Sequence, residues 1–278
     1  MIQYVSPQVW ASRESRVYRM ERDYDLLLSI LPFEKEWYAR RVPGLRVEFV
    51  GHPIVERHPD AETAAVRSSA LHSPLSPAIL LLPGSRVNEI RRHLPVLLGA
   101  LERMRAAIPT LKARIVLPTD ALVAQARAFG LPNNLELRAG GLAEALTTAD
   151  LAIGKTGTVA LECACFGVPT VAIYKAGWID YQIARRIVNV NHLAMPNLLA
   201  MEEVFPEFIQ DSATAENISR VALELLQNEK KRAEVNTKLA AIVAQLGGPG
   251  ASRRAAEAIV RVMEPRGAAG FTSASSRG

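Results

Sequence analysis

Short runs of branched apolar residues alternate with stretches of helical spacing along most of this chain. The runs predict strands at residues 2–6, 25–30, 47–50, 78–82, 114–117, 135–137, 151–153 and 170–174. Between them, apolar side chains recur every three or four positions, which predicts helices at residues 10–21, 32–40, 61–71, 90–108, 120–129, 142–147, 157–166 and 179–188. Apolar strands that alternate with helices indicate βαβ units and a parallel sheet buried on both faces. The predicted fold class is therefore α/β.

Three stretches interrupt this alternation. Pro95 falls early in the helical pattern that begins at Ile90, so that helix either starts at Pro95 or is kinked there. Residues 56–77 carry several prolines and polar turns, and we interpret them as a hinge between two domains. The C-terminal part shows helical spacing only, which predicts helices at residues 214–227, 229–245 and 250–263. The tail, residues 265–278, is rich in glycine, alanine and serine and is expected to be disordered.

Composition narrows the function only a little. The chain of 278 residues is 49% apolar and has a formal net charge of +5. That mildly basic balance suits anionic small molecules or an anionic membrane surface, and it is too weak and dispersed to argue for nucleic acid. The cysteines, Cys163 and Cys165, lie one residue apart in an apolar run, which predicts free thiols in a reducing cytoplasm. No run approaches the roughly 20 apolar residues of a membrane span.

The first candidate for chemistry is the turn that follows the predicted strand at residues 78–82. Pro83 and Gly84 end the apolar run, Ser85 and Arg86 come next, and a helical pattern then begins. Such a turn presents backbone N–H groups and the positive end of a helix to an anion. Arg86 can add a bidentate grip on phosphate, and Gly84 lets the backbone approach a ligand closely. The alternative is an ordinary strand–helix turn with a surface arginine.

A second turn repeats this logic after the predicted strand at residues 151–153. A glycine- and threonine-rich segment with Thr156 and Gly157 leads into a helix that starts near Thr158. Glu162 follows one helical turn later, where its carboxylate can accept hydrogen bonds from both hydroxyls of a ribose. An ordinary helix start with a threonine cap is the alternative. Two such turns at the carboxyl ends of strands favour a nucleotide, because ligands bind at that edge of open α/β sheets.

Other polar residues allow two interpretations each. Asn197 follows Pro196 outside any periodic element, so it is either a turn residue or an amide placed in a cleft. Four arginines recur at every third position, which indicates either a solvated face or a contact to phosphate or anionic lipid headgroups: Arg13, Arg16, Arg19 and Arg22. His93, in the helix after the first turn, is expected at the surface. Motifs typical of metalloproteases, paired-cysteine metal sites and P-loops do not occur in the sequence.

Several segments, taken together and in this order, resemble the lipid-A-disaccharide synthase family of bacterial GT-B glycosyltransferases. The segments that carry the resemblance are Tyr4-Val5-Ser6-Pro7-Gln8-Val9-Trp10-Ala11, Leu31-Pro32-Phe33-Glu34, Phe49-Val50-Gly51-His52-Pro53, Leu82-Pro83-Gly84-Ser85-Arg86 with Glu89-Ile90, Thr156-Gly157-Thr158 with Leu161-Glu162, Tyr174-Lys175 and Pro196-Asn197-Leu198-Leu199-Ala200. The resemblance covers the chain from about Tyr4 to Met263. It implies a GT-B type fold with a Rossmann-like donor domain.

The resemblance also implies an activity in the lipid A and lipopolysaccharide biosynthesis of Gram-negative bacteria. The family transfers 2,3-diacylglucosamine from UDP to 2,3-diacylglucosamine 1-phosphate with inversion, and it releases UDP. Neither a metal nor another cofactor is expected. The family works as a peripheral protein on the cytoplasmic face of the inner membrane. The substrate-binding residues that it implies are Gly84, Ser85 and Arg86 on the diphosphate, Gly157 and Thr158 in support, Glu162 on the ribose and Asn197 along the donor site.

One departure from the family is large. The family has an N-terminal Rossmann-like half before the Tyr4-Val5-Ser6-Pro7 segment, and that half holds a glycine-rich acceptor loop and the proposed aspartate base. Here Met1 stands just before the segment, so we interpret the chain as N-terminally truncated, assign no base and expect no disaccharide formation by the chain alone. Two smaller departures are Ser12, where the family often has tryptophan, and Thr156, where it often has serine.

The resemblance sets the expected domains and leaves other functions open. Residues 1–55 are the expected remnant of the acceptor domain, 56–77 the hinge, and 78–264 the UDP-sugar donor domain with its C-terminal helices, before the tail. The expected partner is a second copy of the chain or a separate N-terminal half. The alternative functions are a non-catalytic UDP-sugar-binding remnant or another GT-B enzyme that uses UDP-N-acetylglucosamine.

Overall fold

The computed structural model describes residues 1–58, 76–132, 134–188 and 190–264. Its contacts divide the chain into two compact units: residues 1–53 together with the chain from Gly247 onward, and residues 54–246. The expected helix at 61–71, most of the expected hinge at 56–77 and the expected disordered tail at 265–278 lie outside the described residues. The last helix falls in the first unit, and the division into an acceptor remnant and a donor domain stays a prediction.

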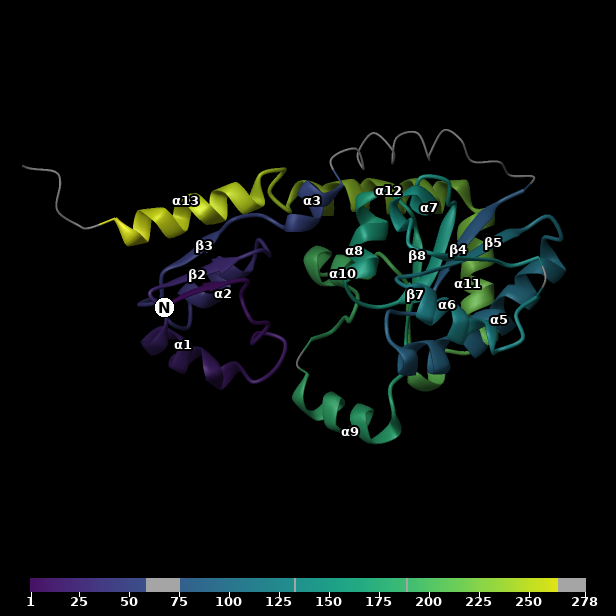
Figure 1. Cartoon of the computed structure of the whole chain (residues 1–278), viewed down its shortest axis with the longest axis horizontal. Coiled ribbons are helices and arrows are strands. Elements are labelled where there is room, and N and C mark those ends of the chain that lie inside the picture. The colour runs from purple at the N-terminus through teal and green to yellow at the C-terminus, as the bar shows by residue number, and fades with distance from the viewer. Residues whose placement is uncertain (59–75, 133, 189, 265–278) are drawn as a thin grey trace, which may run out of the picture. The chain divides into compact units, whose positions relative to one another are not determined.

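The first unit is a small parallel sheet with helices on both faces (Figure 1). Its elements are β1 (Ile2–Tyr4), η1 (Glu14–Arg16), α1 (Val17–Asp23), β2 (Leu26–Ser29), α2 (Glu34–Ala39), β3 (Val47–Phe49) and α13 (Ala251–Met263), with strand order β1-β2-β3. Alternate side chains of a strand point to opposite faces. Leu27 accordingly joins the apolar cluster of α1 and α2, whereas Leu26 and Leu28 pack with Ala255 and Ala258 of α13.

A buried polar cluster holds the loop after β1 in the first unit. The Trp10 indole N–H donates to the Glu34 carboxylate at 3.0 Å, and the Tyr38 hydroxyl donates to the Pro7 carbonyl at 3.1 Å. Burial raises the pKa of the Glu34 carboxyl, although hydrogen bonds from Trp10 and Ser6 oppose the shift. The helix expected at 10–21 is therefore wrong in its first half: Trp10 serves this loop, and the α-helix starts at Val17.

The second unit is a six-stranded parallel sheet between two layers of helices (Figure 1). Its elements are α3 (Pro53–Arg57, which begins at the unit boundary), β4 (Ala78–Leu82), α5 (Val87–Ala107), β5 (Lys112–Leu117), α6 (Asp120–Arg127), β6 (Glu136–Ala139), α7 (Leu142–Leu146), β7 (Leu151–Lys155), α8 (Thr158–Cys165), β8 (Thr170–Tyr174), α9 (Trp178–Ile187), α10 (Met195–Ala200), β9 (Glu207–Ile209), η2 (Gln210–Ser212), α11 (Ala215–Gln227) and α12 (Glu229–Ala244). The strand order is β6-β5-β4-β7-β8-β9, and every pair is parallel.

This strand order places a switch point between β4 and β7. The chain builds outward from β4 on one side through β5 and β6, and on the other side through β7, β8 and β9. The loops that leave β4 and β7 therefore run to opposite faces of the sheet, and a crevice opens between them at the carboxyl ends of the strands. β4, β7 and β8 are buried almost throughout, as the apolar runs predict.

Helix α5 does not break at Pro95. It runs unbroken from Val87 to Ala107 with Pro95 inside, so the expectation of a start at Pro95 is wrong. Pro95 lacks an N–H, and the carbonyl that it leaves unpaired belongs to the exposed residue Arg91, where water can replace the donor. Among the described residues, no helix is both long enough and apolar enough to cross a membrane.

Two short elements differ from the sequence expectation. The segment from Met195 to Ala200, expected outside any regular element, forms α10 with Pro196 in its first turn, a position that needs no proline N–H. Strand β9 pairs with the edge of β8 in a stretch for which no regular element was predicted. Six and three residues are too few for a period of hydrophobicity to show.

We predict that Trp10→Phe destabilises the first unit. The substitution keeps an aromatic ring but removes the indole donor from a buried carboxylate, so the free energy of unfolding should fall by about 1–3 kcal/mol. Urea unfolding followed by circular dichroism measures the effect. Trp178→Phe is the matched control, because Trp178 is 74% exposed and should change stability by less than about 0.5 kcal/mol. Equal effects of the two substitutions would contradict the buried role of Trp10.

Candidate functional site

The switch point of the second unit holds a pocket of about 550 Å³. The turn from β4 to α5 and the turn from β7 to α8 line it together, as the topology requires. Six of the predicted substrate-binding residues lie in this pocket: Gly84, Ser85, Arg86, Gly157, Thr158 and Glu162. Glu89, Lys155 and Thr156 complete its polar lining.

The turn after β4 depends on a glycine at position 84. Gly84 has φ +128°, and a Cβ built on it would lie 2.5 Å from one Glu89 carboxylate oxygen. A side chain there would be strained and would also collide with Glu89. The Ser85 N–H donates to the same carboxylate at 2.8 Å. Arg86 precedes the first residue of α5, and its side chain is 79% exposed.

The turn after β7 leads directly into α8. Gly157 precedes the first helical residue, Thr158, and no side chain caps this helix start. The threonine cap of the alternative interpretation is thus not formed. An α-helix start leaves backbone N–H groups without helical partners, and the helix dipole makes them attractive to an anion.

Four ionisable side chains give the pocket an even balance of charge. The Lys155 ammonium lies 3.0 Å from the Glu89 carboxylate, and the Arg86 guanidinium lies 3.5 Å from it. Burial opposes ionisation of Glu89, but the Ser85 N–H and the Lys155 ammonium outweigh it and hold the pKa of this carboxyl below its ordinary value. Among the described residues, the contact to the mostly buried Glu162 carboxylate is a long one of 3.4 Å from Arg57 of α3.

His93 lies beneath this turn and is fully buried, so its expected surface position is wrong. One ring nitrogen, Nδ1, lies 2.7 Å from the Pro83 carbonyl, and the Lys175 backbone N–H donates to the other, Nε2, at 2.9 Å. Burial lowers the pKa of the His93 imidazole, so the ring is neutral at pH 7. The spacing of four residues from Glu89 could have indicated a shared helix face with the pocket residues.

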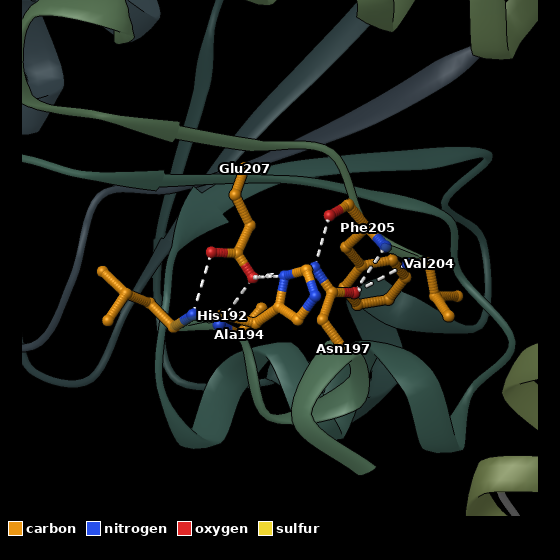
Figure 2. Close-up of polar contacts among 7 residues, drawn as sticks. His192, Ala194, Asn197, Val204, Phe205 and Glu207 are labelled. Carbon is orange, nitrogen blue, oxygen red and sulfur yellow. Dashed lines mark hydrogen bonds and ion pairs between the residues drawn. The ribbon is translucent and has the colours of Figure 1, made fainter. Parts of the chain in front are cut away.

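Asn197 is the one predicted site residue that the structure places elsewhere. Figure 2 shows its amide within a buried network. The amide nitrogen donates to the Phe205 carbonyl and to the Glu207 carboxylate, each at 2.7 Å. The amide oxygen accepts from the N–H groups of Val204 and Phe205. Asn197 does not line the switch-point pocket, so its substrate-binding role stays a prediction without support from these contacts.

Glu207 completes the same network from β9. Its carboxylate accepts from the backbone N–H groups of Leu193 at 2.9 Å and Ala194 at 3.0 Å, and the His192 ring lies 3.8 Å away (Figure 2). Asn197 and Glu207 together therefore tie α10 and the segment before it to the edge strand. Glu207 was not singled out in the sequence, where it stands as one acidic residue among many.

The other sequence candidates do not join the pocket. Cys163 and Cys165 are buried free thiols, and burial raises the pKa of each to about 12, which makes them poor nucleophiles. The four arginines expected on one helix are divided: Arg13 and Arg16 belong to the η1 region, and Arg19 and Arg22 lie on α1 beside Asp23. All four are exposed, which leaves both of their interpretations open.

Two solved structures share this architecture. The UDP-GlcNAc 2-epimerase from Neisseria meningitidis bound to UDP-GlcNAc is 13% identical with a TM-score of 0.57, over 92% of this chain and 67% of its own. The S. aureus MnaA structure with UDP is 12% identical with a TM-score of 0.57, over 87% of this chain and 62% of its own. At such low identities the similarity concerns the fold alone.

The doubly wound sheet and the two glycine turns at its switch point define an α/β protein of the GT-B class. A family model described as "Lipid-A-disaccharide synthetase" matches residues 1–262, and the chain belongs to that glycosyltransferase family. The lipid-A-disaccharide synthase of Anaeromyxobacter sp. (strain K) is 38% identical over 95% of this chain and 69% of its own length. The synthase of Nitrosococcus oceani is 36% identical over 95% of this chain and 68% of its own.

We predict that Asn197→Ala lowers stability more than it lowers ligand binding. The substitution leaves buried backbone groups of Val204 and Phe205 without partners, so the free energy of unfolding should fall by about 2–4 kcal/mol. Thermal and urea unfolding measure this loss, and titration with UDP gives the affinity of the folded variant. Asn217→Ala, at a partly exposed position of α11, is the control. A fall in UDP affinity with unchanged stability would instead establish the direct donor contact that the family resemblance implies.

Proposed function

We propose that this chain binds UDP-2,3-diacylglucosamine and supplies the donor site for transfer of the sugar to 2,3-diacylglucosamine 1-phosphate, releasing UDP. Family membership supports the reaction class. The observation that carries the donor assignment is the convergence of two turns, each leading into a helix start without a side-chain cap, in one pocket at the switch point.

The diphosphate is the part of the donor that this pocket suits best. The starts of α5 and α8 supply backbone N–H groups and two helix dipoles, which favour an anion between them. Arg86 is exposed at the pocket, and its side-chain contact among the described residues is a long one of 3.5 Å to Glu89, so it is available for a bidentate grip on phosphate oxygens. The related folds include proteins solved with UDP and with UDP-GlcNAc, which is consistent with this choice of ligand.

Glu162 is the group proposed to hold the ribose. It lies one turn into α8, beside the pocket, and is mostly buried. A carboxylate in such a place accepts two hydrogen bonds from vicinal hydroxyls, and it strongly disfavours an analogue that lacks one of them. The long contact from Arg57 leaves acceptor capacity for a ligand.

The chemistry assigned to these residues is stabilisation of the leaving group. As the acceptor hydroxyl displaces UDP at the anomeric carbon, negative charge grows on the diphosphate. Fixed N–H dipoles and nearby cations stabilise such charge without having to reorganise, and this is a large source of catalysis. Arg86 and Lys155 are the cations of the described pocket that occupy this position. We assign no catalytic base.

The proposed substrates also set the proposed location. Both carry fatty acyl chains, so the chain would meet them at the cytoplasmic face of the inner membrane as a peripheral protein. The exposed Arg13, Arg16, Arg19 and Arg22 are suited to the anionic lipid surface there.

We predict that Arg86→Ala weakens UDP binding about tenfold. A charge-assisted bidentate contact contributes about 1.5–3 kcal/mol, and 1.4 kcal/mol corresponds to a factor of ten in affinity. Isothermal titration calorimetry at fixed ionic strength measures the affinity. Arg91→Ala is the matched control, because Arg91 is exposed on the same helix and does not line the pocket. Unchanged UDP affinity in Arg86→Ala would refute the diphosphate assignment.

A second prediction concerns the sugar of the nucleotide. The unsubstituted chain should bind UDP more tightly than 2′-deoxy-UDP, which keeps only the 3′-hydroxyl contact to Glu162. Glu162→Ala should abolish that preference by weakening the binding of UDP more than that of 2′-deoxy-UDP. The exposed residue Glu234 on α12 supplies the control Glu234→Ala, which should keep the preference. If Glu162→Ala weakens both ligands by the same factor, the carboxylate does not hold the 2′-hydroxyl.

A further inference from the structure

We propose that Glu89 and His93 form a strand-end brace: two polar side chains of α5 that fix the ends of β4, β7 and β8 and thereby position the phosphate-binding turns. The inference rests on the proposed function of the pocket, because it gives these residues a role in binding a nucleoside diphosphate. Neither residue needs to touch the ligand. They act through the backbone and through Lys155, so they are positioning residues.

Glu89 joins the two turns to each other. One carboxylate oxygen accepts from the Ser85 N–H of the turn after β4, and the other lies 3.0 Å from the ammonium of Lys155 at the end of β7. A glutamate at the third position of a helix often reaches back to a backbone N–H near its start, and that explains the first contact alone. The contact to Lys155 goes further, because it crosses the switch point.

The packing around Glu89 leaves its side chain little freedom. Even a single added Cβ at Gly84 would lie 2.7 Å from the Glu89 Cβ and 2.5 Å from its carboxylate oxygen. The carboxylate therefore sits against the backbone of the turn, and it occupies the Ser85 N–H that a phosphate would otherwise use. We assign the diphosphate to the helix starts and Arg86, with Glu89 holding their frame.

His93 extends the brace to β8. It lies four residues after Glu89, one helical turn further along α5. Its ring connects the Pro83 carbonyl, just after β4, with the Lys175 N–H, just after β8, at 2.7 and 2.9 Å. β4, β7 and β8 are consecutive neighbours in the sheet. Two side chains of one helix thus connect the carboxyl ends of three adjacent strands.

The two bonds of His93 require one protonation state. A backbone carbonyl can only accept, so Nδ1 carries the hydrogen, and a backbone N–H can only donate, so Nε2 carries none. A protonated ring would turn Nε2 into a donor that faces the Lys175 N–H. The charged groups that act on the ring are Glu89 on its own helix, Lys155 at the end of β7 and Lys175 after β8. The brace is therefore complete only with a neutral His93.

The test compares UDP with uridine, which lacks the diphosphate. His93→Leu keeps an apolar side chain of similar size but removes both bonds, and His93→Asn keeps a donor near the Nδ1 position. We expect the ratio of UDP affinity to uridine affinity to fall about tenfold in His93→Leu, while uridine affinity stays the same. His93→Asn should be intermediate. Glu102→Gln, an exposed carboxylate on the same helix, is the control and should keep the preference.

For Glu89→Gln, the brace and simple electrostatics predict opposite changes in UDP affinity. Removing a negative charge from the pocket would on its own strengthen binding of anionic UDP. If Glu89 positions the turns, Glu89→Gln should instead weaken UDP binding about threefold, because a neutral amide holds Lys155 less firmly. Tighter UDP binding in this variant would overturn the assignment of Glu89.

A pH profile provides a readout that general loss of stability would not give. UDP affinity of the unsubstituted chain should fall more steeply on acidification below pH 6.5 than that of His93→Asn, because only the former contains the imidazole that must stay neutral. The titration of UDP itself is common to both proteins and cancels in the comparison. Parallel profiles would count against the brace.

Hydrogen exchange separates failure of this inference from failure of the proposed function. The Lys175 and Ser85 amides should exchange faster in His93→Leu and Glu89→Ala respectively, with protection of the β5 amides unchanged. Faster exchange without any UDP binding by the unsubstituted chain would refute the nucleotide function and keep the brace as a structural feature. Unchanged exchange at both amides, or equal losses of UDP and uridine affinity, would refute the brace.

Discussion

The constraint on which the rest of the second unit depends is a set of backbone N–H groups without helical partners, which follow the neighbouring strands β4 and β7. A helix start leaves such N–H groups unpaired. Because the order in which the chain adds strands reverses between β4 and β7, two helix starts meet at one crevice. Gly84 allows the tight turn after β4, and the start of α8 has no side-chain cap, so both helix starts face the crevice with N–H groups that have no helical partners. The proposed binding site thus depends first on the strand order and only then on particular side chains.

The charge balance of the pocket gives the backbone N–H groups of the two helix starts a larger role in the proposed site. Glu89 and Glu162 offset Arg86 and Lys155, so the four ionisable side chains of the described lining sum to zero. If the proposed donor site holds a diphosphate, the attraction comes largely from fixed dipoles and from the local placement of the two cations. A site of this kind should favour a ligand that satisfies carboxylates and N–H groups together, as a nucleoside diphosphate does, over free phosphate.

Much of the fold was predictable because its central strands β4, β7 and β8 are apolar on both faces. β4 and β8 were predicted with their observed ends, and the alternation with helices predicted the parallel sheet. Local patterns could not reveal β9, whose three residues pair only because β8 offers an edge, or α10, whose six residues contain a proline and an asparagine. Helix α5 continues through Pro95 because the carbonyl that this proline leaves unpaired belongs to the exposed residue Arg91, and the local pattern does not show that exposure.

The residues of the candidate site also differ in whether local sequence could predict them. Gly84, Arg86 and Glu162 could be predicted because turn chemistry and helix position are local properties, and the structure gathers them in one pocket. His93 could not, since its partners follow two different strands and only the sheet order brings them to α5. His93 follows two arginines on the helix, and its spacing from Glu89 indicates a shared helix face but neither its burial nor these two partners.

Asn197 and Glu34 show why a family motif does not by itself identify chemistry. Both belong to segments that carry the family resemblance, and both satisfy buried backbone or indole groups within their own unit. An unpaired buried polar group costs about as much free energy as losing a substrate contact, so selection can retain a residue for either reason. The distinguishing observation is where the hydrogen bonds go. Those of Asn197 end within the protein, whereas Arg86 is exposed at the pocket and makes a long contact to Glu89 within the part of the chain that the structure describes.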